Sequence, residues 1–341
     1  MATARATGAT AAITTERGGV RANILTDTAA RQSYLDGVLA LKAEASGVMS
    51  NSLGIPGPAR DLSTFDLFVV WHHWAMSLFT PPSQGDRNAA HRGPVFLPWH
   101  RFMLIFFEAQ LRRVLGNQDF GLPYWSWTDD GELPLDEQPQ SPLWADDCMG
   151  RDGDPAQGFV VSSGPFSATS SFRVDLAADS NGVLRTVSRP LRRRFNVPLG
   201  LPPRLELQAA LADDDYDEDP WSADSVSFRN LLEGWVPAET QPHLHNRVHV
   251  WVGGDMLPSS SPNDPVFYLN HCNVDRAWSA WLEDATEPPY LPDEFASDDL
   301  FRHRIDDPLF SIFTSDDDDR WTPRRMLDVA ETYTYDSLTL T

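Results

Sequence analysis

The chain has 341 residues, a formal net charge of −22 and only two cysteines. Nucleic-acid binding needs a basic surface, so this charge argues against a nucleic-acid partner, and two cysteines exclude a fold built on disulfide bonds. No apolar run is long enough for a bilayer and no secretory signal opens the chain, so we expect a soluble protein without a membrane partner, cytoplasmic as it stands or secreted if a leader was removed.

The first half of the chain predicts three helices after a mobile segment. Residues 1–20 are rich in alanine, threonine and glycine, and we expect them to be mobile. Apolar residues recur at helical spacing over residues 29–43 and again over residues 62–79, where a pair of prolines ends the pattern. The third predicted helix, from about residue 99 to residue 115, is so apolar that we expect burial on most of its sides.

The second half begins with a long stretch that is rich in proline, glycine, serine and aspartate. We expect this stretch, residues 123–222, to form irregular loops draped over a helical centre. Asp264 or its neighbour Asn263 is placed to cap a helix that has Pro265 in its first turn. No repeat is present at a solenoid period, so residues 21–341 are predicted to form a single domain. The helices predicted in this half span residues 225–234, 244–252 and 265–282.

Charged residues are distributed unevenly along the sequence. Lys42 is the only lysine, and aspartates run together at residues 213–215 and 316–319. Two interpretations of the acidic surface stay open: solvated loops, or adaptation to high salt, in which dense carboxylates keep the chain soluble. The one basic cluster, residues 185–194, is interpreted as a surface feature that balances charge.

Six of the nine histidines fall into two groups of three, one in each half of the chain. Neutral imidazole is the commonest metal ligand, and ligation by nitrogen alone favours copper, zinc, iron or nickel over magnesium or calcium. Three ligands per metal leave positions open for a small molecule. The pattern therefore predicts a reactive two-metal centre. Its candidate ligands are His72, His91 and His100, and then His245, His249 and His271.

Two of the remaining histidines are interpreted as ordinary core residues. His72 continues an apolar stripe that runs at three- and four-residue steps from Phe65 to Phe79, whereas His73 shares its helix face with Asp66. His72 is therefore the ligand candidate of the adjacent pair. A single histidine on an apolar face is usually a core residue, and this interpretation applies to His73 and to His303.

The helix expected to carry His271 offers two supporting residues. Phe267 precedes this histidine by one turn and Asp275 follows it by one turn. A carboxylate at that spacing is suited to orienting a ligand or a neighbouring arginine. Cys272 adjoins His271, but one helical step rotates it away by about 100°, so we expect a packed thiol there.

Four segments carry a close resemblance to a known family: LPYWSW, DRNAAHRGPVFLPWHR, HNRVHVWVGG and SPNDPVFYLNHCNVDRAW. They resemble the bacterial tyrosinases, members of the type 3 copper family, and the likeness runs from about residue 20 to Tyr335. It implies two copper ions, copper A held by the first three histidines and copper B by the second three. It also implies a mainly α fold, an antiparallel four-helix bundle enclosing the dicopper site, with long irregular loops and a few short strands.

The resemblance implies an oxidoreductase that uses dioxygen on small phenols. The expected reactions are ortho-hydroxylation of monophenols and oxidation of o-diphenols to o-quinones at the dinuclear copper centre. Two alternatives are a catechol or o-aminophenol oxidase with little monophenolase activity, and a haemocyanin-like dioxygen carrier. A two-metal zinc hydrolase is disfavoured by the missing carboxylate ligands.

Two candidate catalytic residues follow from the same resemblance. In tyrosinases similar to this chain, a glutamate and the asparagine after the first copper B histidine are proposed to hold a water that activates monophenols. Here Asn246 follows His245 and Glu233 matches the glutamate, across a connector that looks longer than usual. The alternative interpretations are a helix-start residue for Asn246 and an ordinary surface charge for Glu233.

The last expectations concern the pocket mouth and the end of the chain. Residues 259–261 are three serines, which we expect to form a small polar rim around an open entrance. Six residues follow Tyr335, so no C-terminal plug domain is expected. Any copper-delivery partner is then predicted to be a separate protein, and the sequence assigns no oligomeric state.

Overall fold

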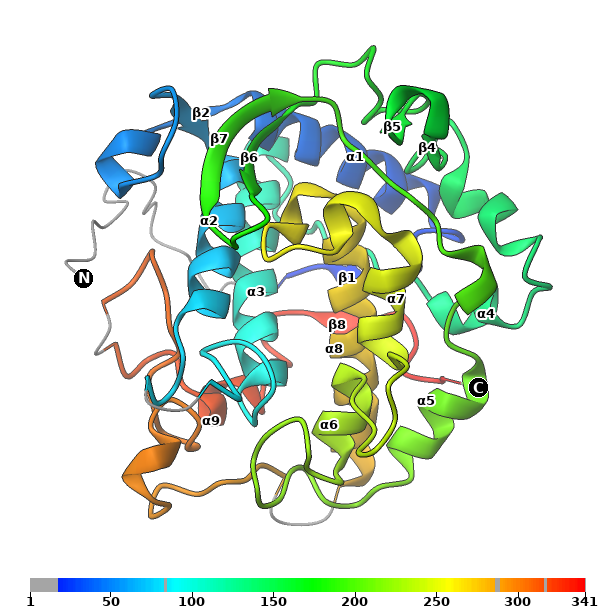
Figure 1. Cartoon of the computed structure of the whole chain (residues 1–341). Helices are drawn as coiled ribbons and strands as arrows, with labels where there is room; N and C mark the ends of the chain where they lie inside the picture. Colours follow the sequence, from blue (N-terminus) through cyan, green and yellow to red (C-terminus); the bar gives the residue numbers. More distant parts are fainter. Residues whose placement is uncertain (1–17, 83–84, 286–288, 316–317, 341) are drawn as a thin grey trace.

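The two ends of the described chain meet in one small sheet. The computed structural model describes residues 18–82, 85–285, 289–315 and 318–340, so most of the segment expected to be mobile, residues 1–17, lies outside the described residues. Strand β1 (Val20–Arg21) pairs in parallel with β8 (Thr334–Tyr335) near the C-terminus. Figure 1 shows this pair behind the central helices.

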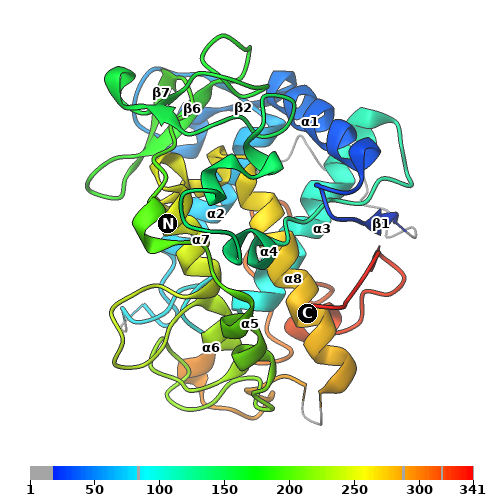
Figure 2. The same ribbon diagram turned by 90° about the vertical axis from the view of Figure 1, so that its right-hand side faces the viewer.

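The structure is mainly α-helical, as predicted, and its longest helices form the centre of the molecule. Helix α3 packs against both α1 and α8, while α7 also contacts α8. Figure 1 shows α2, α3, α7 and α8 together at the centre, with α1 above them, and Figure 2 shows α8 running past α3 in the turned view. These helices are α1 (Thr28–Ala43), α2 (Thr64–Ser77), α3 (Phe96–Leu115), α7 (Leu244–Val252) and α8 (Val266–Asp284).

Local signals explain where the central helices begin. Helix α2 begins two residues later than predicted because Ser63 caps it: its side chain accepts a hydrogen bond from the Asp66 N–H, and the Asp66 carboxylate accepts one from the Ser63 N–H at 3.1 Å. Helix α3 begins three residues earlier than predicted. Pro98 fits inside its first turn, because the N–H that proline lacks has no intrahelical partner there.

The expectation of wholly irregular loops over residues 123–222 is wrong in part. Strands β6 (Val174–Ala178) and β7 (Leu184–Arg189) form an antiparallel hairpin that contacts α2. Buried Val174 and Leu176 alternate with less buried neighbours along β6, and an Asn-Gly pair lies between the strands, which is a hairpin signal. The stretch also contains α4 (Trp127–Gly131), α5 (Arg204–Leu211) and the short pair β4 (Gly153–Asp154) and β5 (Val160–Val161).

The remaining elements are short. Strands β2 (Ala45–Met49) and β3 (Asp61–Ser63) pair antiparallel beside α2. Helix α6 (Phe228–Glu233) precedes the connector to α7, and α9 (Pro323–Met326) lies against α3. Short 3-10 helices span Ser50–Leu53, Gln138–Gln140, Pro142–Trp144, Pro155–Gln157, Val197–Leu199, Gly254–Met256, Ser261–Asn263 and Asp298–Leu300.

The core between the central helices is built from aromatic side chains. Trp71 on α2 meets Trp99 and Phe102 on α3 edge to face, with ring centroids 5.5 and 5.1 Å apart. Phe107 on α3 stacks on Tyr268 of α8 at 3.6 Å. These contacts hold α2 and α8 against α3. Across the described ranges, every helix is too short or too polar to cross a bilayer.

The basic cluster at residues 185–194 is only partly a surface feature, contrary to the prediction. Arg193 is fully buried, and its guanidinium donates to both carboxylate oxygens of Asp264 at 2.7 and 2.8 Å. Its remaining donors reach the carbonyl oxygens of Met149 and Gly150. An arginine can be buried where its charge is paired and its donors are satisfied. This pair ties the long loop region to Asp264, two residues before α8.

Candidate metal centre

The structure brings the six predicted histidines together in two groups of three. Within each group the ligand-capable atoms all lie within 4.8 Å of one another. The two groups adjoin, because the rings of His100 and His271 stack with centroids 4.2 Å apart. In the first group His72 lies on α2 and His100 on α3, with His91 in the loop between them; in the second, His245 and His249 lie on α7 and His271 on α8.

Backbone carbonyls determine which nitrogen of four histidines is available. In each of these rings Nδ1 lies 2.7–3.1 Å from a carbonyl oxygen, which can only accept a hydrogen bond. Nδ1 therefore carries the proton, and Nε2 presents its lone pair. The four pairs are His72 with Ser259, His100 with Phe96, His245 with Glu233, and His249 with Met256.

The Nε2 atoms, whose lone pairs are free, converge on a space that suits a metal ion. His72 Nε2 and His100 Nε2 are buried without a hydrogen-bond partner among the described residues. His271 Nε2 lies 3.2 Å from His245 Nε2 and 3.4 Å from His249 Nε2. Two nitrogens bound to one tetrahedral ion at about 2.0–2.1 Å would be about 3.3 Å apart. The spacing of these histidine nitrogens therefore fits a metal ion of the kind that imidazole ligands favour, such as copper.

Burial keeps all six imidazoles neutral near pH 7. Desolvation lowers the pKa of His72 to about 3 and that of His249 to about 4. The same cause lowers the pKa of the other four rings well below the ordinary value. Neutral rings are the form that binds metals.

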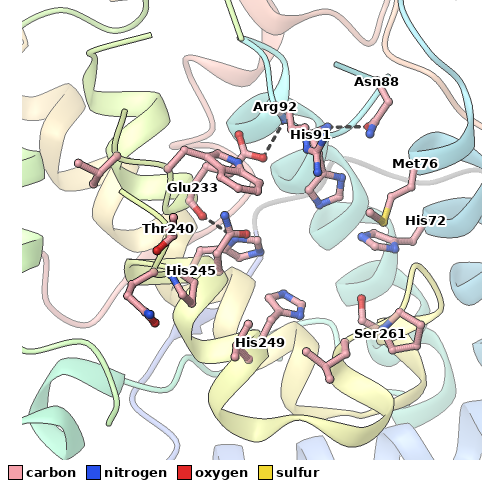
Figure 3. Close-up of a pocket in the computed structure, with 18 of the residues that line it drawn as sticks. His72, Met76, Asn88, His91, Arg92, Glu233, Thr240, His245, His249 and Ser261 are labelled. Carbon is pink, nitrogen blue, oxygen red and sulfur yellow. Dashed lines mark hydrogen bonds between the residues drawn. The ribbon is translucent and has the colours of Figure 1, made fainter. Parts of the chain in front are cut away.

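The loop histidine of the first group is held by a local turn. The Asn88 side-chain oxygen accepts hydrogen bonds from the N–H groups of Ala90 and His91, at 3.0 and 2.9 Å. Figure 3 shows the asparagine beside this histidine. An asparagine that bonds its own following backbone defines a turn without a helix or strand. The turn places the His91 ring 4.8 Å from that of His100.

The two histidines interpreted as core residues lie outside the groups. His73 Nδ1 is 2.7 Å from the Ser259 hydroxyl, and His303 Nε2 is 2.6 Å from the Thr80 hydroxyl. Of the adjacent pair on α2, the structure therefore places His72 in the group, as the helical stripe predicts.

Phe267 packs between the two groups. Its ring centroid lies 4.2 Å from that of His271 and 5.0 Å from that of His72. An apolar ring in this position restricts the orientations of two imidazoles from different helices. The supporting role predicted for Phe267 beside His271 is compatible with these contacts and stays a prediction.

Asp275 orients arginines rather than a histidine. Its carboxylate accepts hydrogen bonds from Arg101 at 2.5 Å, Arg21 at 3.0 Å, Tyr333 at 2.6 Å and Tyr335 at 2.5 Å. Burial alone would raise the pKa of Asp275, but the two guanidinium groups lower it. Of the two roles that its spacing allows, the structure favours the neighbouring arginine.

Cys272 is a packed thiol, as expected. The side chain is fully buried, and Sγ lies 3.3 Å from the carbonyl oxygen of Leu122, away from the histidine groups. Burial raises the pKa of this thiol to about 12, so it stays protonated.

A cavity of about 560 Å³ opens above the histidines. Four of the six rings line it, whereas His100 and His271 lie deeper. Figure 3 shows these four rings around the cavity, with Met76 and Ser261 on one wall and Glu233 on the other. The lining also includes Phe79, Asn88, Arg92, Trp235, Val236, Glu239, Thr240, Gln241, Pro242, Asn246, Val250, Leu257 and Pro258.

Glu233 is a buried wall residue of this cavity, so its interpretation as an ordinary surface charge is wrong. Its carboxylate accepts the Arg92 N–H at 2.8 Å and the Arg229 guanidinium at 3.2 Å. Burial raises the pKa of Glu233, and Arg229 opposes this shift. Gly234 follows with a φ of 106°, and a Cβ there would lie 2.1 Å from the His243 carbonyl oxygen, so only glycine fits this turn.

Asn246 lines the cavity from the first turn of α7. Its Nδ2 is buried and has no hydrogen-bond partner among the described residues. A buried amide without a partner is costly unless a water or ligand satisfies it. This position on the wall makes Asn246 more than a helix-start residue.

The expectation of a serine rim is wrong for two of the three serines. The carbonyl oxygen of Ser259 accepts a hydrogen bond from Nδ1 of His72, and the Ser259 hydroxyl contacts Nδ1 of His73. Ser260 is buried, and its hydroxyl accepts the Ala178 N–H. Only Ser261 lines the cavity. Arg92, directly after His91, and residues of the connector from Trp235 to Pro242 line the cavity instead, although neither was predicted to belong to the site.

Sequence comparison relates most of the chain to one family. Residues 62–284 match a family profile described as the common central domain of tyrosinase. The tyrosinase of Streptomyces antibioticus is 40% identical over 230 residues, which cover 67% of this chain and 76% of that protein. The grixazone synthase of Streptomyces griseus subsp. griseus is 34% identical over 292 residues, which cover 80% of this chain and 90% of that protein.

Solved structures share the fold at low sequence identity. A polyphenol oxidase from Thermothelomyces thermophila superposes with a TM-score of 0.63 at 22% identity, covering 94% of this chain and 89% of that one. A functional unit of octopus hemocyanin superposes with a TM-score of 0.53 at 19% identity, covering 94% of this chain and 69% of that one. At this identity the likeness describes the fold alone.

Proposed function

Because this chain belongs to the tyrosinase family of dinuclear copper oxidoreductases that act on phenols, we propose that its two histidine groups are the copper A and copper B sites of a tyrosinase. Copper A is assigned to His72, His91 and His100, and copper B to His245, His249 and His271. The observation that carries this assignment is the convergence of six neutral imidazoles, five buried and His249 partly buried, in two adjoining groups. The reactions proposed are ortho-hydroxylation of monophenols and oxidation of o-diphenols to o-quinones by dioxygen.

The helices around these groups are proposed to form a four-helix enclosure for both metals. Helices α2 and α3 each carry a histidine of the first group, and α7 and α8 carry the second group. Contacts of α3 with α8 and of α7 with α8 support this arrangement. Residues 21–341 are proposed to be one catalytic domain, which the pairing of β1 with β8 supports.

The protein's own groups are proposed to position the substrate and remove its proton. Bound copper supplies the two-electron redox chemistry with dioxygen. Phe267 keeps the space between the groups apolar, and the cavity admits a phenol whose hydroxyl points toward the four rings that line it. The rest of the substrate then lies toward the opening.

Asn246 and Glu233 are proposed to hold the water that deprotonates a monophenol. A phenolic hydroxyl ordinarily has a pKa of about 10, so a base must accept its proton near pH 7. The Asn246 amide lines the cavity with an unpartnered Nδ2, and the Glu233 carboxylate is held on the same wall by Arg92 and Arg229. A raised pKa brings the Glu233 carboxylate closer to the range in which a general base works.

The leading alternative is an oxidase of catechols or o-aminophenols with little monophenolase activity, and the similarity to a grixazone synthase over 80% of the chain keeps it in view. Initial rates on a monophenol and its matching catechol separate the two. We expect the copper-loaded chain to turn over both. Turnover of the catechol alone would favour the alternative, and reversible dioxygen binding without turnover would favour a carrier.

Metal analysis tests the assignment itself. We expect two coppers per chain, and substitution of His100 by alanine should leave one. Zinc in place of copper after loading with both ions would contradict the proposal.

Copper delivery by a separate protein is proposed because five of the six ligand rings are buried in the described part of the chain. Full copper loading of the purified chain by itself would contradict this part.

A further inference from the structure

Arg92 carries the only cationic side chain among arginines and lysines lining the cavity in the described part of the chain. The protein as a whole has a formal net charge of −22, so its field repels anionic molecules that approach the surface. The cavity contributes two further carboxylates, Glu233 and Glu239. A single positive charge in this setting therefore has a large influence on which substrates bind.

The backbone of Arg92 is held by a hydrogen bond, whereas its guanidinium donors are not used by other described residues. The residue has a φ of 60°, in the left-handed region, and its N–H donates to Glu233 at 2.8 Å. Its guanidinium carbon lies 5.1 Å from the centre of the Trp235 ring. Among the residues that the structure describes, no carboxylate forms an ion pair with this guanidinium, and the side chain is exposed.

Neighbouring charges on the cavity wall are already engaged. Glu233 accepts from Arg92 N and from Arg229, and Glu239 lies 3.0 Å from Nε2 of His243. Both carboxylates therefore have partners, whereas the guanidinium of Arg92, with its five donors, contacts the Trp235 ring and forms no hydrogen bond or ion pair within the described part of the chain.

The orientation of the substrate brings its side arm to Arg92. A phenol must point its hydroxyl at the histidine groups, so a substituent on the opposite side of the ring extends toward the mouth. Arg92 directly follows His91 and shares that mouth with Trp235. A guanidinium matches a carboxylate through two parallel hydrogen bonds, which neutral groups cannot replace at equal strength.

We propose that Arg92 is a specificity-determining residue that binds the carboxylate of phenols and catechols bearing an acidic side arm. The inference rests on the proposed phenol oxidation and names the substrate class that this cavity prefers. Arg92 recognises the far end of the substrate and takes no part in the redox step.

Matched substrates test the proposal: 3-(3,4-dihydroxyphenyl)propanoate and its methyl ester, which differ only in the charge of the arm. For copper-loaded wild-type protein we expect a higher kcat/KM for the acid. In Arg92→Gln the ratio of kcat/KM for the acid to kcat/KM for the ester should fall about tenfold, equivalent to about 1.4 kcal/mol. We expect most of this change in the KM for the acid. The ratio for Arg92→Lys should lie between those of wild type and Arg92→Gln, because lysine keeps the charge but cannot bind a carboxylate through two parallel hydrogen bonds.

The ratio of two substrates on one preparation is independent of how much copper the variant holds, which matters because Arg92 adjoins a proposed ligand. Arg151→Gln is the control, since this arginine is exposed, pairs with Asp146 and is absent from the cavity lining; its ratio should match wild type. An unchanged ratio in Arg92→Gln, or an equal loss on both substrates, overturns the proposal.

Salt supplies a test that needs no variant. Because Arg92 is exposed, sodium chloride should lower the wild-type preference for the acid while the ester rate stays constant. A preference that is indifferent to salt contradicts the proposal. If neither catechol is oxidised at all, the proposed function fails instead.

Discussion

Single residues around the two histidine groups divide into those that hold the rings and those that face the substrate. Backbone carbonyls orient four rings, and Phe267 packs against His72 and His271. Asn246 lines the cavity, and its buried Nδ2 has no hydrogen-bond partner among the described residues. Substitutions of residues that hold the rings should therefore lower stability, whereas substitutions of residues that line the cavity should lower the rate of substrate turnover.

Replacing Asn246 by alanine should impair monophenol hydroxylation selectively. Loss of the amide removes one partner of the proposed water, so we expect the monophenol kcat to fall by about tenfold or more. The matching catechol needs no such water, and its rate should change by less than about twofold. Rates are measured on one copper-loaded preparation. Thr240→Ala, on the same cavity wall, is the control. Equal losses on both substrates would contradict the role.

Replacing Phe267 by alanine should destabilise the metal-free protein. Removing a fully buried phenylalanine costs about 3–5 kcal/mol, and this ring packs against two imidazoles. Urea unfolding gives the free energy of unfolding directly. Phe295→Ala is the matched control because that ring is 87% exposed, so its effect should stay within about 0.5 kcal/mol. Similar effects for both variants would refute the packing role.

Secondary-structure elements far apart in the sequence meet at Asp275. Its carboxylate on α8 binds Arg101 on α3 and Arg21 on β1, and it also accepts the hydroxyls of Tyr333 and Tyr335 near the C-terminus. A buried carboxylate between two buried guanidinium groups neutralises charge that neither helix could bury alone. The network therefore joins α8 and α3, which carry His271 and His100, to both ends of the described chain.

Asp275→Asn should lower the free energy of unfolding at pH 7 by about 3–5 kcal/mol, because it leaves guanidinium charge buried with less compensation. The two arginines lower the pKa of Asp275 below its unfolded value of about 3.9. The contribution is therefore present above that pH and is lost as the pH falls through the lower folded value. The free energies of unfolding of wild type and Asp275→Asn should therefore approach each other as the pH falls, and denaturant unfolding of both proteins from pH 7 to pH 3 measures this.

The exposed pair of Arg185 with Asp179 supplies the control for this network. Asp179→Asn should change stability by less than about 1 kcal/mol, since exposed ion pairs contribute little. A difference between wild type and Asp275→Asn that persists undiminished at pH 3 would contradict the electrostatic account.

The whole molecule carries a formal net charge of −22 and a sequence pI of about 4.6. Repulsion among its carboxylates opposes the compact state at neutral pH. Many aspartates pair with exposed arginines, such as Asp306 with Arg324 and Asp318 with Arg320, but the excess of acidic residues stays unbalanced.

Sodium chloride should raise the Tm of the metal-free chain at pH 7. Salt shortens the Debye length from about 30 Å at 0.01 M to about 3 Å at 1 M, so repulsion between distant carboxylates disappears. The same titration at pH 5, nearer the pI, is the control and should give a smaller shift. A Tm at pH 7 that does not respond to salt would also contradict the interpretation of the acidic surface as an adaptation to high salt.

Much of this protein could be predicted from its residues because the signals are local. The helices α1, α7 and α8 follow from apolar periodicity to within about two residues, and the stripe on α2 selects His72 over His73. Six imidazoles without a carboxylate ligand narrow the metal to copper, zinc, iron or nickel, and the resemblance to the tyrosinases selects copper. Cys272 was assigned to the packed interior from a single helical step.

Other features depend on contacts between residues far apart in the sequence. The residues around Glu233 allow its interpretation as a surface charge, but the turn at Gly234 and the hydrogen bond from the Arg92 N–H place its carboxylate in the interior. The mouth was expected to be a serine rim, but two of those serines hold α2 and β6. Helical and strand periods determine local structure and ligand chemistry, whereas burial and the membership of a cavity arise only when distant segments pack together. Sequence therefore determined the kind of centre, and the tertiary structure decided which side chains surround its substrate.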